Sequence, residues 1–187
     1  MTQLSAADLE AGLAHIRMSP LDGGRLELIV RRPAIGDREV IESGELDLAV
    51  GLVGDTWSDR PSSRTSDGTP HPQMQINMMN VRCASLVGVE EERRALAGDQ
   101  LYVDLDISEE NLPPGTLLRL GGAVLVVTAE PHRGCRKFTD RFGIEAHRFV
   151  NSPVGQSLRL RGMNARVVQA GTVTKGDIIS KVGNETV

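Results

Sequence analysis

The chain has 187 residues, with 21 Lys and Arg against 25 Asp and Glu, so its formal net charge is −4. This length fits a single domain, and the 40% of apolar residues can bury a core, which excludes an intrinsically disordered protein. One Trp, one Tyr and three Phe, without a basic excess, give no footprint for duplex DNA and no stacking platform for single strands. We therefore expect no nucleic-acid partner.

The chain also lacks the marks of a membrane or secreted protein. No apolar run approaches the roughly 18 residues that a membrane span needs. Charged residues among the first 19 argue against a secretory signal. The cysteines, Cys83 and Cys135, are too few for a disulfide framework or a four-cysteine zinc site; a single disulfide is open, but reduced thiols are favoured. We expect a cytoplasmic protein with no membrane partner.

The first 52 residues predict a helix followed by strands. Ser5 is a candidate N-cap with Asp8 three residues later, and Leu4 and Leu9 have the spacing of a hydrophobic staple. Residues 25–31 alternate, which predicts a strand with Leu26, Leu28 and Val30 on one buried face. A short strand is expected over 39–42, and one further alternating strand over 46–52.

The segment from Asp55 to Pro72 is polar, and Trp57 is its only large apolar residue. A connection of this length inside a compact domain is uncommon, so it is either disordered or lines a functional site.

The rest of the chain alternates short strands with short helices. A helix broken at Gly143 is expected over 139–151, burying Phe142, Ile144 and Phe149. This close spacing predicts a mainly β fold with short helices (α+β), a barrel or sandwich rather than βαβ units. The other elements expected are strands over 73–79, 101–107, 116–120, 123–129 and 165–170, and helical segments over 80–87, 90–97 and 153–160.

Cys135 is the strongest candidate for chemistry. It lies among Arg133, Arg136 and Lys137, with His132 three residues before it, near the start of a predicted helix. Neighbouring cations favour the thiolate, which attacks electrophilic sulfur, binds a soft metal or carries a persulfide. The alternative is an inert cysteine in a solvated loop. Cys83, among apolar residues, is interpreted as a small core residue.

The order of motifs resembles the MOSC domain, the C-terminal domain of molybdenum cofactor sulfurases. A Val-rich strand, then a loop with Cys135, a basic residue and a helix, is similar to the end of that domain. Upstream, 51–55 (Gly-Leu-Val-Gly-Asp) looks like the family's Gly-x-x-Gly-Asp loop. Gly98-Asp99-Gln100-Leu101 stands where the family has Gly-Glu-Asn-Leu, and 115–122 fits its Gly-x-x-Leu-x-x-Gly stretch. The match covers about 45–170.

The resemblance implies one MOSC-like domain over 1–187, with the helix and strands of 1–44 joining a MOSC-type β-barrel. It implies that Cys135 carries sulfane sulfur, with His132 as a candidate proton shuttle. It also implies that Arg133, Arg136 and Lys137 lower the pKa of Cys135 or hold an anionic cofactor phosphate, and that Gly54, Asp55 and His71 are further cofactor-binding residues. The segment 55–72 is then expected to fold over the site.

Two functions stay open under this resemblance. The first is a sulfur carrier that forms a persulfide on Cys135 and needs a sulfur donor protein, a molybdoenzyme or a redox partner. The second is a module that binds the molybdenum cofactor (molybdopterin), with Cys135 as metal ligand and no sulfur transfer of its own. A cysteine hydrolase or thiol reductase is less favoured, because the sequence alone places no base and orienting acid beside the thiol.

Overall fold

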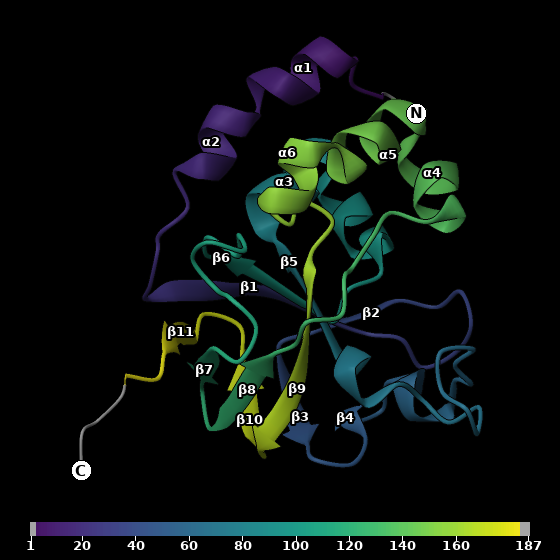
Figure 1. Ribbon diagram of the computed structural model, residues 1–187, viewed down its shortest axis with the longest axis vertical. Helices are drawn as coiled ribbons and strands as arrows, with labels where there is room; N and C mark the ends of the chain where they lie inside the picture. The colour runs from purple at the N-terminus through teal and green to yellow at the C-terminus, as the bar shows by residue number, and fades with distance from the viewer. Residues whose placement is uncertain (1–2, 184–187) are drawn as a thin grey trace.

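The computed structural model describes residues 3–183. It is a closed barrel with helices gathered at one end (Figure 1). The barrel order is β1-β6-β5-β9-β8-β7-β11, and pairing of β11 with β1 closes it. β5 and β6 are parallel, and the other barrel neighbours are antiparallel. The barrel strands are β1 (Gly24–Arg31), β5 (Ile76–Asn80), β6 (Leu101–Asp104), β7 (Leu117–Leu120), β8 (Ala123–Val127), β9 (Met163–Gln169) and β11 (Ile178–Lys181).

A second, small sheet and the helices complete the fold. The expected α+β class with a β-barrel is confirmed. β2 (Glu39–Ile41) extends the main sheet beside β1, and the small sheet has the order β10 (Gly171–Thr174), β3 (Ser43–Asp47), β4 (Gly51–Leu52). The α-helices are α1 (Ala6–Ala11), α2 (Leu13–Arg17), α3 (Val81–Gly88), α4 (Arg136–Phe142), α5 (Ile144–Asn151) and α6 (Pro153–Ser157). The 3₁₀ helices are η1 (Thr56–Asp59), η2 (Pro72–Met74) and η3 (Glu91–Ala97).

Apolar side chains form two separate cores. One fills the barrel and includes Leu26, Ile76 and Leu125, as expected for a barrel this narrow. The other lies between the barrel and the helices, where Tyr102 of β6 packs with Phe138 of α4. Because strands such as β1 and β6 face both cores, they are covered on both sides.

This double burial explains why the alternation predicted for β1 is wrong. The pairing of β1 with β6 shifts register between Leu26 and Leu28, as in a β-bulge. Leu26 and Ile29 belong to the barrel core, whereas Val30 packs in the helical layer. The strand exists as predicted, but its apolar residues divide between two cores.

The single strand predicted over 46–52 is a hairpin. The carboxylate of Asp47 accepts hydrogen bonds from the backbone N–H groups of Ala49 (2.7 Å) and Val50 (3.0 Å), and this turns the chain. Leu46 then pairs with Leu52 across β3 and β4. The alternation of apolar residues over 46–52 therefore spans a turn that begins at Asp47.

Local capping signals are confirmed elsewhere. Ser5 and Asp8 form a capping box at the start of α1, although Gly12 separates α1 from α2. The break at Gly143 separates α4 from α5, and Phe142 and Phe149 are buried as predicted.

Several details of the predicted elements are wrong. Ile144, the first residue of α5, is exposed, whereas Ala146, Phe149 and Val150 are the buried residues of that helix. The helix predicted over 90–97 is the 3₁₀ helix η3, and the strand predicted over 101–107 ends at Asp104. The sequence pattern missed β10 and β11. Within residues 3–183, no helix has the length and apolar character to cross a membrane.

Candidate functional site

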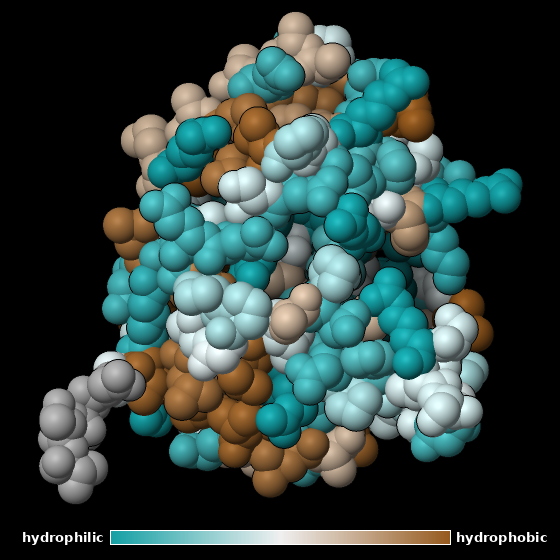
Figure 2. Space-filling view, viewed as in Figure 1, coloured by the Kyte–Doolittle hydropathy of each residue, from teal (hydrophilic) through white to brown (hydrophobic). Residues whose placement is uncertain are grey.

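A cleft of about 690 Å³ opens beside α4, between the loop that follows β1 and the first part of the polar segment 55–72. Figure 2 shows mainly hydrophilic residues on the right-hand side of the molecule, where Figure 1 places α4 and these loops. The cleft is lined by Arg32, Ile35, Gly36, Arg38, Arg60, Pro61, Asn77, Ala97, Gly98, His132, Cys135, Lys137, Phe138, Asp140, Arg141 and Arg161.

Three of the predicted site residues meet in this cleft: His132, Cys135 and Lys137. Cys135 is the N-cap residue of α4, and its exposed side chain makes no capping hydrogen bond. The thiol is therefore open to small molecules that enter the cleft. The polar segment is folded by η1 and η2 and contributes Arg60 and Pro61 to the lining.

The other predicted site residues lie outside the lining. Arg133 lines a separate cavity of about 80 Å³, and exposed Arg136 lines neither space. His71 accepts a hydrogen bond from the backbone N–H of Gln73 and lies 3.8 Å from a carboxylate oxygen of Glu130. Gly54, at φ 81°, forms the turn before Asp55.

Asp55 acts on the cleft indirectly, through Arg32. Its two carboxylate oxygens accept hydrogen bonds from the Arg32 Nε and Nη2 atoms, each at 2.7 Å. Arg32 Nη1 also donates to the Gly98 carbonyl at 2.8 Å. Because both side chains are buried, this bidentate pair fixes the Arg32 guanidinium in the cleft wall.

Asp99, which the sequence analysis did not select, organises the neighbouring part of the wall. The side chain is fully buried; one oxygen is 2.9 Å from His132 Nε2 and the other accepts from Arg161 Nη1 at 2.7 Å. Burial alone would raise the pKa of Asp99, but Arg161 and His132 lower it to about 2. Asp99 is therefore a carboxylate at neutral pH, and it orients both neighbours.

His132 is neutral at pH 7 in this setting. Burial and the charge of Arg161 lower its pKa more than Asp99 raises it. A neutral imidazole that donates from Nε2 to a carboxylate has an unprotonated Nδ1. Within the described residues this Nδ1 makes no hydrogen bond, and the atom is not fully buried. His132 therefore has an open proton-accepting nitrogen, and its side chain lines both the cleft and the cavity of about 80 Å³.

Gly162 makes room for this pair. Its φ is +116°, and a Cβ at that position would lie 2.6 Å from the Met78 carbonyl oxygen. The same Cβ would lie 3.0 Å from His132 Cδ2 and 3.1 Å from Asp99 Oδ1. Only glycine fits both this conformation and this space.

Cationic side chains dominate the cleft, and several lack a carboxylate partner within residues 3–183. These unpaired cations are Arg38, Arg60, Lys137 and Arg141. Burial, followed by the charges of Arg141 and Arg32, lowers the pKa of Arg38. Burial and Arg32 likewise lower the pKa of Arg60. Because these like charges repel one another, an anion in the cleft would be favoured.

Cys83 is a core residue, as the sequence predicts. It is buried in α3, and its thiol donates to the Leu160 carbonyl at 3.1 Å. Burial raises the pKa of Cys83 to about 12, so its thiolate does not form at neutral pH. The two cysteines are free thiols in different environments.

The residues that sequence reasoning missed are mainly arginines far from Cys135 in the chain. Asp99 was visible as the acidic position of the Gly98–Leu101 motif, but no pattern linked it to His132. Arg32 follows the predicted strand and Arg161 precedes another, so only the closed barrel brings them together. Within the described residues no three His, Cys, Asp or Glu side chains gather as metal ligands.

Comparisons with known proteins agree with this fold. Residues 96–180 match the sequence profile of the MOSC domain. The YuaD protein from Bacillus subtilis superposes with a TM-score of 0.60 at 18% identity, covering 83% of this chain and 93% of that one. YiiM from Escherichia coli superposes with a TM-score of 0.51 at 18% identity, covering 87% and 72%. A search of curated protein sequences gave no match. The predicted resemblance is confirmed over residues 96–180, which match the MOSC domain, and the mixed α+β barrel fold is shared with these structures.

Proposed function

We propose that this MOSC-domain protein carries sulfane sulfur as a persulfide on Cys135. The observation that supports the proposal most directly is an exposed thiol in a cation-lined cleft, with a neutral histidine in the same lining. A carrier cysteine needs a reachable thiolate, and it needs surroundings that accept the charge of a persulfide.

The loading step conserves atoms and charge. The Cys135 thiol loses its proton to Nδ1 of His132, and the thiolate attacks the outer sulfur of a hydropersulfide donor. The donor's S–S bond breaks, its inner sulfur leaves as a thiolate, and Cys135 gains the terminal sulfur. Asp99 stabilises the imidazolium that forms, since it already holds the opposite ring nitrogen.

Donor and acceptor come from outside the chain. The sulfur source is a sulfane-sulfur donor, for which a hydropersulfide is the simplest model, and the acceptor is a molybdoenzyme or another redox partner that reaches Cys135 through the open side of the cleft.

The alternative function is binding of the molybdenum cofactor, with which the MOSC family is associated. The cleft fits such a group in two respects: it has unpaired cations for a phosphate, and its thiol is a soft ligand for a metal. Arg38 and Lys137 would hold the phosphate, and Cys135 would contact the metal. The bound group would supply redox chemistry at molybdenum; the chain's residues would bind and orient it.

Intact mass after incubation with cysteamine hydropersulfide tests the first proposal. We expect a gain of one sulfur that Cys135→Ser abolishes and the matched variant Cys83→Ser retains, because only Cys135 is exposed. A gain that survives in Cys135→Ser contradicts sulfur carriage at this residue. Stoichiometric molybdenum that copurifies with the protein and is lost in Cys135→Ser, without any gain of sulfur, favours the cofactor-binding function instead.

A further inference from the structure

The cations of the cleft exceed what a hydropersulfide donor without an anionic tail requires. Arg38, Arg60 and Arg141 are half-buried, and Lys137 is exposed at the rim. None of the four has a carboxylate partner within residues 3–183. Among the described residues, Asp140 is the only acidic one in the lining, and it is exposed. Holding like charges together in this way is favourable when an anion binds between them.

Arg161 adds a second, independent observation. Its side chain is only 7% exposed, lies over the Phe138 ring of α4 and lines the cleft. Nη1 and Nη2 are satisfied by Asp99 and the Ala97 carbonyl, but Nε has no partner among residues 3–183. Arg38 Nε is likewise buried without a partner. Unpaired buried donors are costly in a protein, and two of them in one cleft wall indicate a missing acceptor.

We infer that the cleft selects a small sulfane-sulfur anion whose leaving group is an oxyanion, of the thiosulfate class, as the donor to Cys135. This inference rests on the proposed persulfide function and names its substrate class. The arginines would hold the oxyanion, while the outer sulfur faces the thiol that lines the same cleft. A cleft of about 690 Å³ admits such an anion, whereas half-buried cations give a large donor protein no comparable charge contact.

The step balances without an added oxidant or reductant. The Cys135 thiolate attacks the outer sulfur of thiosulfate, a new S–S bond forms, and the bond to the sulfonate sulfur breaks. Its electron pair leaves with sulfite, so a thiolate and a dianion give a persulfide anion and a dianion. The arginines stabilise the charge that develops on sulfite, which is where an electrostatic contribution accelerates such a transfer.

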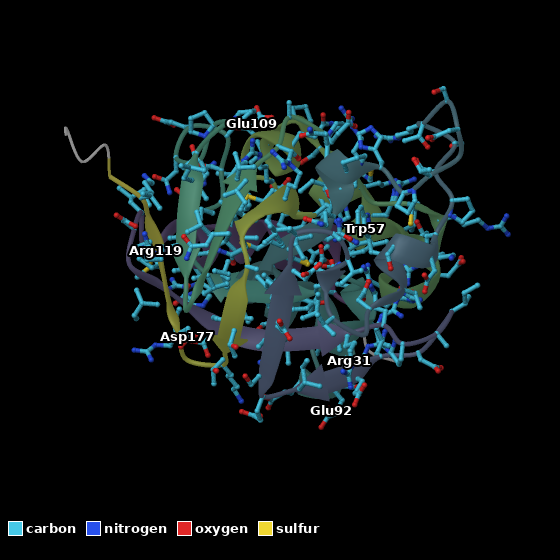
Figure 3. All side chains as sticks on the ribbon, turned by 90° about the horizontal axis from the view of Figure 1, so that it is seen from below. Arg31, Trp57, Glu92, Glu109, Arg119 and Asp177 are labelled. Atoms are coloured by element: carbon cyan, nitrogen blue, oxygen red, sulfur yellow. The ribbon has the colours of Figure 1, made fainter. Side chains whose placement is uncertain are left out.

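Single-turnover persulfidation with two donors tests the inference. Thiosulfate carries two negative charges, whereas cysteamine hydropersulfide carries an ammonium group that offsets its persulfide charge. With thiosulfate we expect one sulfite released per sulfur gained on Cys135. Loss of a charge-assisted contact in Arg38→Gln should slow the thiosulfate reaction roughly 10- to 100-fold and slow the cysteamine hydropersulfide reaction by a clearly smaller factor. The control is Arg119→Gln, which should change neither rate. Arg119 is an exposed residue of β7, and Figure 3 shows it away from Trp57 of η1, the helix that precedes Arg60.

The two donors separate failure of this inference from failure of the proposed function. If cysteamine hydropersulfide transfers sulfur to Cys135 and thiosulfate does not, the proposed sulfur carriage is supported and the inference about the donor is overturned. Equal slowing with both donors in Arg38→Gln also overturns it, because the cation then acts through the fold. Saturable binding of inorganic phosphate without any reaction of thiosulfate assigns the cations to a phosphate-bearing ligand and overturns it as well. No gain of sulfur from either donor removes the proposed function itself.

Discussion

Replacing Asp99 with Asn tests how the site is held together. The substitution keeps the size of the side chain and removes its charge, so Arg161 loses its carboxylate partner inside the wall while His132 keeps at most a neutral acceptor. Both Asp99 and Arg161 are buried, which makes this pair different from the surface ion pairs of the molecule.

The pKa and the burial of Asp99 set lower and upper limits on the free energy of unfolding that Asp99→Asn would lose. The pKa is about 2 against an ordinary 3.8, and that difference corresponds to roughly 2 kcal/mol of folding free energy above pH 4. Removing one partner of a buried pair costs about 3–5 kcal/mol, because the remaining charge is left uncompensated. We therefore expect Asp99→Asn to lower the free energy of unfolding at pH 7 by about 2–5 kcal/mol.

Urea unfolding between pH 3 and pH 7 measures this change. The folded-state pKa of Asp99 is depressed, so its stabilisation is complete above the unfolded value of 3.8 and is lost as pH falls toward 2. His132 acts in the same direction: its folded-state pKa is lowered, so acid below its ordinary value of 6.5 favours the unfolded state. The wild type should lose stability with acid more steeply than Asp99→Asn below pH 4.

The matched control is Asp104→Asn. Asp104 also makes a two-point contact with an arginine, Arg82, at 2.7 and 3.0 Å, but its side chain is 29% exposed. Such a pair contributes about 0–1 kcal/mol. Equal losses in the two variants, or a loss below about 1 kcal/mol in Asp99→Asn, would refute the view that a buried carboxylate organises the wall.

Two further predictions concern the backbone and the thiols. Gly162→Ala should destabilise the protein by more than about 1 kcal/mol in thermal unfolding, because its Cβ meets the Met78 carbonyl. Gly176→Ala, also at positive φ, would meet only Arg25 Nη1 at an ordinary 3.9 Å and should cost clearly less; equal costs would contradict the steric argument. Iodoacetamide should modify Cys135 at pH 7 and leave Cys83 intact until the protein unfolds, as peptide mass analysis would show; modification of Cys83 in the folded protein would contradict its burial.

Much of the fold could be predicted because its signals are local. The capping box of Ser5 and Asp8, the break at Gly143 and the apolar run of β8 each act within a few residues. The assignments failed where tertiary contacts decide the outcome. Leu28 lies beside a bulge set by pairing with β6, and β11 joins the sheet only by closing the barrel.

The candidate site divides in the same way. His132, Cys135 and Lys137 were visible together because one loop and one helix turn carry them. The cationic wall was not visible, because its arginines come from the loop that follows β1, from the segment after η1, from α4 and from the residues before β9. The charge composition did not predict the wall either, because a net charge of −4 is compatible with a local cluster of cations.

The position of the acids explains how an acidic chain can keep a cationic cleft. Asp55 and Asp99 lie behind the lining, where each neutralises one arginine and fixes its direction. The half-buried and exposed cations of the lining have no carboxylate partner among the described residues, so they set the potential that an entering anion meets. Removing a carboxylate from behind the wall therefore adds positive charge to the cleft while it weakens the fold. If the wall works in this way, Asp99→Asn should lower stability and at the same time tighten the binding of an inorganic anion such as sulfate.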